Sequence, residues 1–356
     1  MKHAQAESGG AIGASLVVTE LDAGNRARWD AFVEGCPHST FFHWSAWKWL
    51  MEDVFGHRTC FLMAERAGKV VGVVPLAQVK SRLFGHSVVS LPFCVYGGVA
   101  CEDEAATALL HDEAVRFAER CGAEYLEVHN VRQQRSDWPA QDLYVTFRKE
   151  ILPDVEANML AIPRKQRAMV RKGIKAELRS EIDETVDRFY ELYADNVHRH
   201  GTPPFPKRYF ADLKRVFGDK CEVLVVVDPS GRPVSGVMSF YFKNEVLPYY
   251  AGDLFEARDL AANDFKYWEL MRRACERGIK VFDYGRSKQG TGSFDFKKNW
   301  GFEPAPLHYE FKLLKRDEVP QNNPLNPKYQ LFIKTWRRLP RPMANFLGGI
   351  LVRHLT

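Results

Sequence analysis

The chain has 356 residues, of which 46% are apolar and 27% charged, and its net charge is +5. This length suits one long domain or two ordinary ones, and the composition excludes a disordered chain, a collagen and a disulfide scaffold. The net charge is too small to indicate a nucleic-acid partner by itself, and we expect no DNA binding.

Seven cysteines occur singly, without a CxxC pair, which is typical of reduced, structural cysteine. We expect no metal site, because His and Cys residues do not cluster at ligand spacing. The N-terminus shows no signal-peptide pattern, and no segment approaches the ~20 apolar residues of a membrane-spanning helix. We therefore expect a cytoplasmic protein.

The first elements along the chain are a hairpin, a helix and a strand. Residues 60–64 and 70–79 have a strand pattern on both sides of a turn at 67–69. A helix follows, with an apolar stripe from Leu110 to Cys121 and Gly122 as its stop. Residues 125–128 are then expected to form a strand.

A basic connector at 163–180 comes next, with seven Lys or Arg residues against one Glu. Pro163 is suited to open a helix there. The helix predicted most strongly follows at 183–200, where one face is apolar and Gly201 comes after the last residue.

The second half repeats the order of the first. A hairpin is expected at 222–241, a helix from about Asn263 to Gly278 and a strand at 281–284. Leu91-Pro92 is echoed by Leu247-Pro248, and Gly122 by Gly278, both at an offset of 156 residues (247 − 91 and 278 − 122). We predict two similar domains, 1–155 and 156–318.

The tail at 319–356 contains six Lys or Arg residues and no acid. The tail and the connector together have a net charge of +12, which leaves a net charge of −7 for the rest of the chain (5 − 12). Its mixture of apolar and basic residues fits two alternatives: packing on the body, or peripheral contact with an anionic inner-membrane surface.

The repeated order of elements is similar to the core of the Gcn5-related (GNAT) acyltransferases. That resemblance implies a donor pyrophosphate on the backbone amides of a helix N-terminus. In the second copy the corresponding loop is 253–263, with Arg258 and Asn263 as candidate cofactor-binding residues, although it lacks the usual glycines. In the first copy the loop carries acids at 102–104, which repel phosphate, so it is poorly suited to coenzyme A.

The densest polar cluster spans 283–302. Its glycines, arginine and lysines suit an anionic group, and a solvated loop is the open alternative. Asp283 and Asp295 are candidate bases for an incoming ammonium, and Tyr284 is a candidate to position or relay. Arg286 is expected to hold a phosphate or carboxylate, while Asp283 could instead be a structural partner of Arg286.

Three segments together resemble the FemAB-like transferases, most closely the subgroup encoded beside exosortase/PEP-CTERM and exopolysaccharide loci. They are 91–98, 200–206, and Asp283-Tyr-Gly-Arg-Ser287 with Phe296-Lys297-x-x-Trp300-Gly301. The resemblance covers about 16–314. It implies an α/β fold of two tandem GNAT-like domains, each a mixed sheet flanked by helices, that meet at a cleft and pass an acyl or aminoacyl group to an amine.

The same resemblance places the pair Phe296-Lys297 at the reaction centre. Lys297 would stabilise the oxyanion of the tetrahedral intermediate. Arg164 or Arg167, together with Lys48, loosely match an Arg/Lys pair that grips the acceptor's nucleotide diphosphate.

Tyr249 and Tyr250 are candidates for substrate contact, with burial in the core as the alternative.

Three functions stay open. The favoured one is an N-acyl- or aminoacyltransferase acting on a cell-envelope or exopolysaccharide precursor, anionic or nucleotide-linked, without a metal or redox cofactor. The second uses acyl-coenzyme A, in place of aminoacyl-tRNA, to acylate a small amine or a sugar nucleotide. The third is a noncatalytic adaptor of the envelope polysaccharide machinery.

Overall fold

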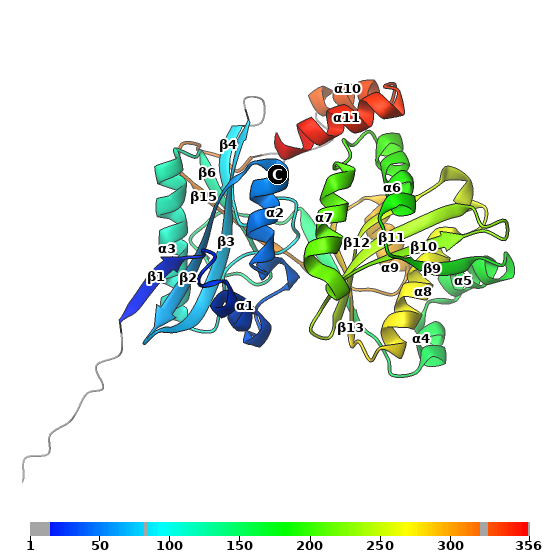
Figure 1. The fold of residues 1–356 in the computed structure, drawn as a ribbon, viewed down its shortest axis with the longest axis horizontal. Helices are drawn as coiled ribbons and strands as arrows, with labels where there is room; N and C mark the ends of the chain where they lie inside the picture. The colour runs from blue at the N-terminus through cyan, green and yellow to red at the C-terminus, as the bar shows by residue number, and fades with distance from the viewer. Residues whose placement is uncertain (1–14, 82–84, 321–326, 355–356) are drawn as a thin grey trace, which may run out of the picture.

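The computed structural model describes residues 15–81, 85–320 and 327–354. Two domains of mixed α/β structure lie side by side, and each has a central sheet with helices on both faces (Figure 1). The predicted fold class, two mixed sheets flanked by helices, is confirmed.

The first domain is built on an eight-stranded sheet. Its strands in spatial order are β1 Leu16–Glu20, β2 Arg58–Arg66, β3 Lys69–Ser81, β4 Gly85–Val89, β6 Tyr125–Asn130, β15 His308–Leu313 and β7 Ala140–Gln141, with β5 Ala100–Cys101 paired to β3. One face is covered by α1 Arg26–Gly35 and α2 Ala46–Phe55, and the other by α3 Glu104–Cys121. The short helix η1 Phe41–His43 precedes α2.

The second domain is built on a seven-stranded sheet. Its strands in spatial order are β14 Pro304–Pro306, β8 Tyr144–Glu150, β13 Val281–Lys288, β12 Glu245–Asp253, β11 Pro233–Phe242, β10 Cys221–Val227 and β9 Arg179–Asp183. One face carries α6 Asp187–His200 and α7 Lys207–Phe217, and the other carries α4 Val155–Ala161, α5 Arg164–Lys175 and α8 Ala262–Glu276. The remaining elements before the tail are η2 Gly218–Lys220, η3 Phe255–Arg258 and α9 Gly292–Asn299.

The two sheets exchange strands. β8 pairs antiparallel with β13 from Val281↔Glu150 to Lys288↔Tyr144, so it belongs to the second sheet although it precedes residue 155. Conversely β15, late in the chain, pairs with β6 of the first sheet. The boundary expected at residue 155 therefore does not separate the two sheets, because each domain is completed by a strand from the other half of the chain.

The predicted repeat is present in both domains. The hairpins are β2–β3 and β10–β11, the helices are α3 and α8, and the strands that follow them are β6 and β13. One part differs between the two copies. The segment 247–252 lies in β12, whereas the similar segment 91–97 lies in a loop after β4. Leu91 and Phe93 have φ angles of 68° and 67° there, which turn the chain away from an extended path.

The domains share one aromatic core. The α1–α2 face of the first domain meets the α6–α7 face of the second. Phe41 stacks on Phe240 with ring centroids 4.3 Å apart, and Trp47 packs on Phe217 at 5.3 Å. The Lys243 ammonium, from the turn between β11 and β12, donates to the Cys36 carbonyl at 2.5 Å. We infer that the two domains form one packed body.

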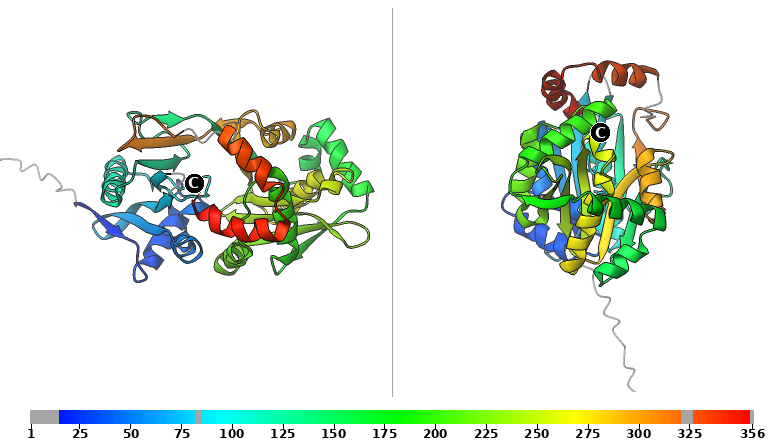
Figure 2. Two further views of the ribbon diagram at one scale, coloured as in Figure 1. Left: turned by 90° about the horizontal axis from the view of Figure 1, so that it is seen from above. Right: turned by 90° about the vertical axis from the view of Figure 1, so that its right-hand side faces the viewer.

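The C-terminal tail packs on this body as α10 Pro327–Trp336, α11 Arg341–Leu351 and η4 Val352–His354. Seen from above in Figure 2, α10 and α11 extend from the second domain toward the first. His198 of α6 donates to the Leu339 carbonyl at 3.0 Å, and His354 lies 3.4 Å from the Lys80 carbonyl of β3. The side chain of Lys328, in the first turn of α10, is outside the described residues. Residues 1–14, where the signal-peptide pattern was sought, are also outside them.

No helix among the described residues is long and apolar enough to cross a bilayer. The same part of the chain contains no group of three or more His, Cys, Asp or Glu side chains placed to hold a metal ion.

Candidate active site

A pocket of about 560 Å³ opens in the second domain between β12, β13, α8, α9 and the end of α6. It exists because β12 and β13 separate. They pair in parallel only at Glu245↔Val281 and Val246↔Phe282, and beyond these residues the strands diverge. The pocket fills the space that their divergence leaves. Its lining includes Asn196, Arg199, His200, Asp253, Arg258, Asn263, Tyr267, Tyr284, Phe296 and Lys297.

The N-terminus of α8 forms one wall of this pocket and carries free backbone donors. Its first flanking residue, Ala261, has φ 55° and provides no side-chain cap. In the described chain no acceptor takes the amide hydrogens of Ala262 and Asn263. Arg258 is exposed beside them, with no carboxylate of a described residue within 4 Å. Free amides, a helix dipole and a free guanidinium are the groups that bind phosphate.

The matching helix of the first domain is closed to an anion. Asp103 caps α3 by accepting from the Ala106 amide at 2.9 Å, and its other oxygen pairs with Arg66 at 2.6 Å. Both helices have an acid in the first turn, Glu104 in α3 and Asp264 in α8, so the cap is what distinguishes them. An acid therefore occupies the cap of α3 and accepts from the third amide of the helix, whereas the cap of α8 has no side-chain acceptor.

Tyr284 supplies an unpartnered hydroxyl to the pocket. It sits at a bulge of β13, where Asp283 pairs with Arg148 and Gly285 with Phe147, so Tyr284 has no direct partner on β8. Its side chain is 5% exposed, and no group in the described structure hydrogen-bonds its oxygen. Burial, together with the nearby Tyr267, raises the pKa of Tyr284 well above its ordinary value. The phenol therefore keeps its proton at neutral pH and can donate it to a ligand.

Lys297 also lines the pocket, but its ammonium faces the backbone. Nζ donates to the carbonyls of Tyr284, Gly285 and Arg286 at 2.7, 3.0 and 3.0 Å. An ammonium has three donors, so in this arrangement none is left for a substrate oxyanion. Burial lowers the pKa of Lys297 to about 7, against the opposing charge of Asp283. Lys297 thereby fixes the bulge that presents Tyr284.

The two candidate acids do not line the pocket. Asp283 is fully buried and accepts from the Gly285 amide at 2.7 Å and the Tyr96 hydroxyl at 3.0 Å, while Arg148 lies 3.5 Å away. Burial raises the pKa of Asp283, and Arg148 opposes that change. Asp283 therefore joins the two domains, and its ion-pair partner is Arg148, not Arg286. Asp295 is exposed on α9 outside the pocket lining.

Arg286 lies outside the pocket, where residues of both sheets meet. Its guanidinium stacks over Tyr144 at 4.7 Å and lies 3.4 Å from the Tyr309 hydroxyl. The residue is exposed, and no carboxylate of the described chain lies within 4 Å of it. Such an unpaired arginine is available to an anionic ligand.

The remaining candidates fall into two groups. Phe296 and Asn263 line the pocket, and Phe296 packs against Tyr267 with ring centroids 5.6 Å apart. Tyr249 and Tyr250 are core residues at the domain interface: Tyr249 donates to the Phe93 carbonyl at 2.8 Å, and Tyr250 shares a hydrogen bond of 2.9 Å with Tyr209. For these two tyrosines the burial alternative holds.

The predicted diphosphate-binding residues are not brought together. Arg164 and Arg167 lie on α5 outside the pocket lining, and Arg167 donates to the Leu160 carbonyl at 3.2 Å. Lys48 lies on α2 of the other domain, where it contacts Glu52 at 3.0 Å and Thr59 at 2.8 Å. These contacts give Lys48 a structural role in the first domain.

Sequence reasoning missed a charged group beneath the pocket. Lys266 is fully buried in α8 and pairs with Asp253 at 2.8 Å. Arg199 of α6 donates to the Asp253 backbone carbonyl and also lines the pocket. The available signal was a lysine inside the otherwise apolar run Phe265–Tyr267, because a buried lysine requires an acid partner.

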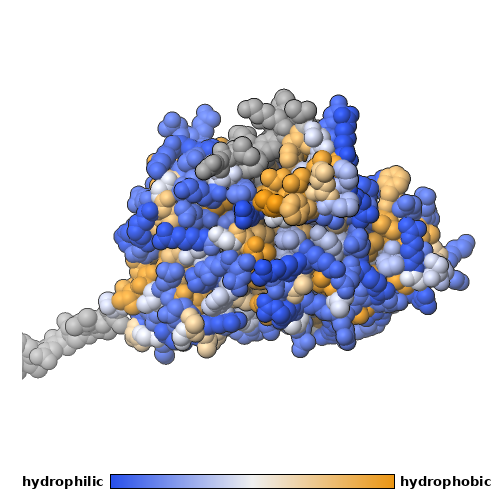
Figure 3. Space-filling view, turned by 45° about the horizontal axis from the view of Figure 1, so that its top comes forward, coloured by the Kyte–Doolittle hydropathy of each residue, from blue (hydrophilic) through white to orange (hydrophobic). Residues whose placement is uncertain are grey.

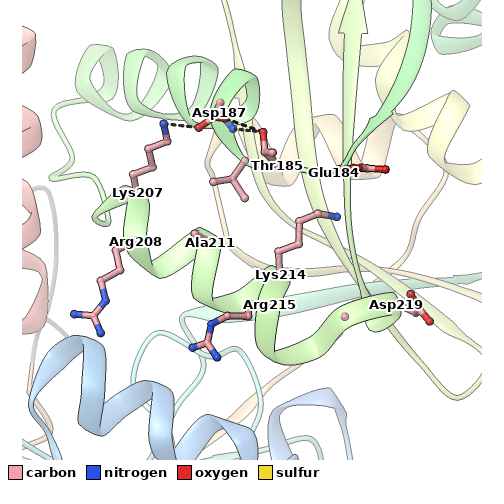
Figure 4. Close-up of a pocket in the computed structure, with 11 residues that line it drawn as sticks. Glu184, Thr185, Asp187, Lys207, Arg208, Ala211, Lys214, Arg215 and Asp219 are labelled. Atoms are coloured by element: carbon pink, nitrogen blue, oxygen red, sulfur yellow. Dashed lines mark hydrogen bonds and ion pairs between the residues drawn. The ribbon is translucent and has the colours of Figure 1, made fainter.

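A second, more open pocket of about 780 Å³ lies between the start of α6 and α7. Figure 4 shows its charged side chains, with Lys207 directed to Asp187. Arg208 and Arg215 both pair with Asp212, at 3.3 and 2.9 Å. Because most of its cations already have acid partners, this pocket is a weaker candidate for an anionic ligand.

Comparison with known proteins agrees with this geometry. Residues 161–298 match the family described as Acetyltransferase (GNAT) domain. A tandem GNAT protein from the clavulanic acid biosynthesis pathway superposes with a TM-score of 0.53 at 12% identity, over 86% of this chain and 100% of the other. The protein has a tandem GNAT-like fold. The family match falls on the domain whose helix N-terminus is open.

Two further solved structures share this tandem GNAT-like arrangement. A FemX protein superposes with a TM-score of 0.66 at 16% identity, over 89% of this chain and 100% of the other. The C-terminal domain of a putative lysylphosphatidylglycerol synthetase from Agrobacterium fabrum gives 0.56 at 14%, over 81% and 92%. No protein of curated function matches the sequence.

Proposed function

We propose that the protein is an N-acyl- or aminoacyltransferase of the FemAB type, which passes an acyl group from a phosphate-bearing donor to an amine. One observation carries this proposal: the unpartnered Tyr284 hydroxyl shares a pocket with the uncapped N-terminus of α8 and the free Arg258. The GNAT family match and the fold shared with the FemX protein support it.

The chemistry follows from the placement of these groups. The donor's phosphate binds the amides of Ala262 and Asn263 and the Arg258 guanidinium, which directs its acyl end toward Tyr284. A neutral acceptor amine attacks the acyl carbon, a C–N bond forms, and the bond to the leaving thiolate or alkoxide breaks. The Tyr284 hydroxyl donates a proton to that leaving group, and the proton of the new ammonium passes through solvent water to the Tyr284 phenolate, which restores the hydroxyl.

The acceptor class is proposed from Arg286, which lies outside the pocket. Arg286 is exposed, lacks an acid partner and stacks on Tyr144, which suits the phosphate or carboxylate of an acceptor. An anionic or nucleotide-linked cell-envelope or exopolysaccharide precursor with a free amine has this chemistry. The sequence resemblance to FemAB-like transferases is the support for that acceptor class.

Two donors share the required phosphate: aminoacyl-tRNA and acyl-coenzyme A. The second donor, with a small amine or sugar nucleotide as acceptor, is favoured by the position of the phosphate-binding groups, because they occupy the helix terminus where a GNAT domain binds its donor. Aminoacyl-tRNA is favoured by the loop at 253–263, because this loop lacks the glycines that are usual where a GNAT domain binds coenzyme A.

Transfer assays separate these possibilities. Purified protein is given acetyl-coenzyme A or aminoacyl-tRNA with amine-bearing sugar nucleotides, and acylated products are measured by mass spectrometry. We expect transfer from one donor, slowed about 10- to 100-fold in Tyr284→Phe and unchanged in Tyr190→Phe, a hydroxyl deletion on α6 outside the pocket. Transfer of equal rate in both variants would remove Tyr284 from the proposal, and absence of transfer from either donor would leave the adaptor function as the better account.

A further inference from the structure

Helix α11 turns three of its large apolar side chains away from the protein. Met343, Phe346 and Ile350 are 50%, 71% and 43% exposed, and their spacing of three and four residues places them on one side of the helix. The small residues Ala344 and Gly348 are buried. This is the reverse of an ordinary surface helix, which buries its large apolar residues.

The small residues are needed for the way the helix sits on the body. A Cβ at Gly348 would lie 2.5 Å from Cδ of Pro204, so a larger residue would separate α11 from the loop after α6. Arg341 lies 3.5 Å from Glu191 and 3.6 Å from Asp195, both on α6. The orientation of α11 is therefore fixed, and its apolar side is held outward.

The tail that carries this apolar side is basic. The tail at 319–356 has six Lys or Arg residues and no acid. Lys334, Arg338 and Arg353 are exposed, and no described carboxylate lies within 4 Å of them. In Figure 3 apolar side chains gather at the top of the molecule, where Figure 1 places α11, with hydrophilic ones around them. Phe332 of α10, 40% exposed, adds to the apolar area.

We propose that this face, Met343, Phe346 and Ile350 with Lys334, Arg338 and Arg353, docks the protein on a bilayer surface that contains anionic lipids. An interfacial helix inserts its apolar side chains among the acyl chains while its cations contact the headgroups. A second copy of the chain fits less well, because a symmetric contact would bring two acid-free basic tails together. The proposal does not depend on the transferase reaction.

Docking at this face has a structural consequence for the pocket. Arg337 donates to the His200 carbonyl at 3.3 Å, and His200 lines the pocket. A Cβ at Gly201 would lie 2.5 Å from Ile333, so α10 packs directly on the end of α6. The docked tail therefore holds the pocket beside the membrane.

The test is co-sedimentation of the full chain with vesicles. One set contains phosphatidylglycerol and phosphatidylcholine, and the other phosphatidylcholine alone. Phe346→Asp is compared with Leu160→Asp, which makes the same kind of change at a residue 57% exposed on α4, in the other layer of the second domain. Both positions are exposed, so both variants are expected to fold, and circular dichroism checks this.

We expect binding to the anionic vesicles, weakened by salt, with about tenfold loss in Phe346→Asp, loss in the double variant Lys334→Glu/Arg338→Glu, and no loss in Leu160→Asp. The proposal is overturned if the full chain binds neither kind of vesicle, or if Phe346→Asp and Leu160→Asp bind alike. A dimer in solution that Phe346→Asp dissociates would also overturn it, and would identify a second copy as the occupant.

Discussion

The Tyr284 hydroxyl is buried and has no hydrogen-bond partner among the described residues. This is unfavourable unless a ligand forms a hydrogen bond with it. Tyr284→Phe removes that hydroxyl without breaking a contact. We therefore expect the transfer rate to fall about 10- to 100-fold, while the thermal unfolding temperature stays the same or rises. Steady-state kinetics and a thermal melt check this prediction. An unfolding temperature that falls together with the rate would mean that the hydroxyl is structural.

For Lys297 we expect a loss of stability, because its ammonium donates hydrogen bonds to three backbone carbonyls. In Lys297→Met these acceptors lose their donor, and we expect the free energy of unfolding to fall by about 2–4 kcal/mol. Urea unfolding measures this change. Activity falls as well, because the bulge at Tyr284 loses its support. Unchanged stability would show that the ammonium is free to serve the substrate.

The pH dependence of stability provides a second check on Lys297. Burial lowers its pKa from 10.5 to about 7 in the folded protein. Between these values the unfolded chain binds more protons than the folded one, so the contribution of Lys297 to stability rises as pH increases. Lys297→Met lacks this titration. We expect the stability difference between wild type and Lys297→Met to widen from about pH 7 to pH 10, and a constant difference would contradict the lowered pKa.

Candidate residues could be located where the signal is local. The segment 283–302 identified Tyr284, Phe296 and Lys297, which line the pocket, and Arg286, which lies outside it. The role of Asp283 was not visible, because its partners Tyr96 and Arg148 lie far away in sequence and reach it through domain contact and strand exchange.

At the scale of elements, the two equivalent helices α3 and α8 differ at their N-terminal cap. α3 is capped by Asp103, whereas α8 has free amides and Arg258 beside them. Arg258→Ala removes a charge that has no acid partner, so we expect the donor's KM to rise about tenfold with no change in unfolding temperature. Arg171→Ala, on the exposed side of α5, is the matched control. Equal KM values for the two variants would exclude Arg258 from donor binding.

Most elements could be predicted because their patterns are local. The hairpins, the helices α3, α6 and α8 and the strand after each copy's helix follow from alternation, apolar stripes and glycine stops. The loop at 91–97 could not, because its path depends on segments far away in sequence: the Phe93 carbonyl accepts from Tyr249 of the second domain, and the Val95 carbonyl accepts from Tyr309 of β15.

At the scale of the whole molecule, strand exchange couples the two domains. β8 leaves the first half of the chain to complete the second sheet, and β15 returns to complete the first. Neither sheet is complete without the other half, and the aromatic core spans both. We expect one cooperative transition in differential scanning calorimetry, with equal calorimetric and van't Hoff enthalpies.

Two separate calorimetric transitions would contradict this coupling. Strand exchange was not predictable from the repeat, because the internal offset identifies similar units without stating which strands pair. A boundary at residue 155 separates the two sequence repeats, but it does not separate the two sheets as their strands are hydrogen-bonded.

The central claim is that the donor binds in the second domain, with its phosphate on α8. A crystal structure of the protein with acetyl-coenzyme A, and another with an aminoacylated mimic of the tRNA 3′ end, tests it most directly. The account predicts that one of these ligands occupies the pocket, its phosphate within hydrogen-bond distance of the Ala262 and Asn263 amides and its acyl group at Tyr284. A donor bound at the first domain beside Asp103, or outside the pocket, would contradict it.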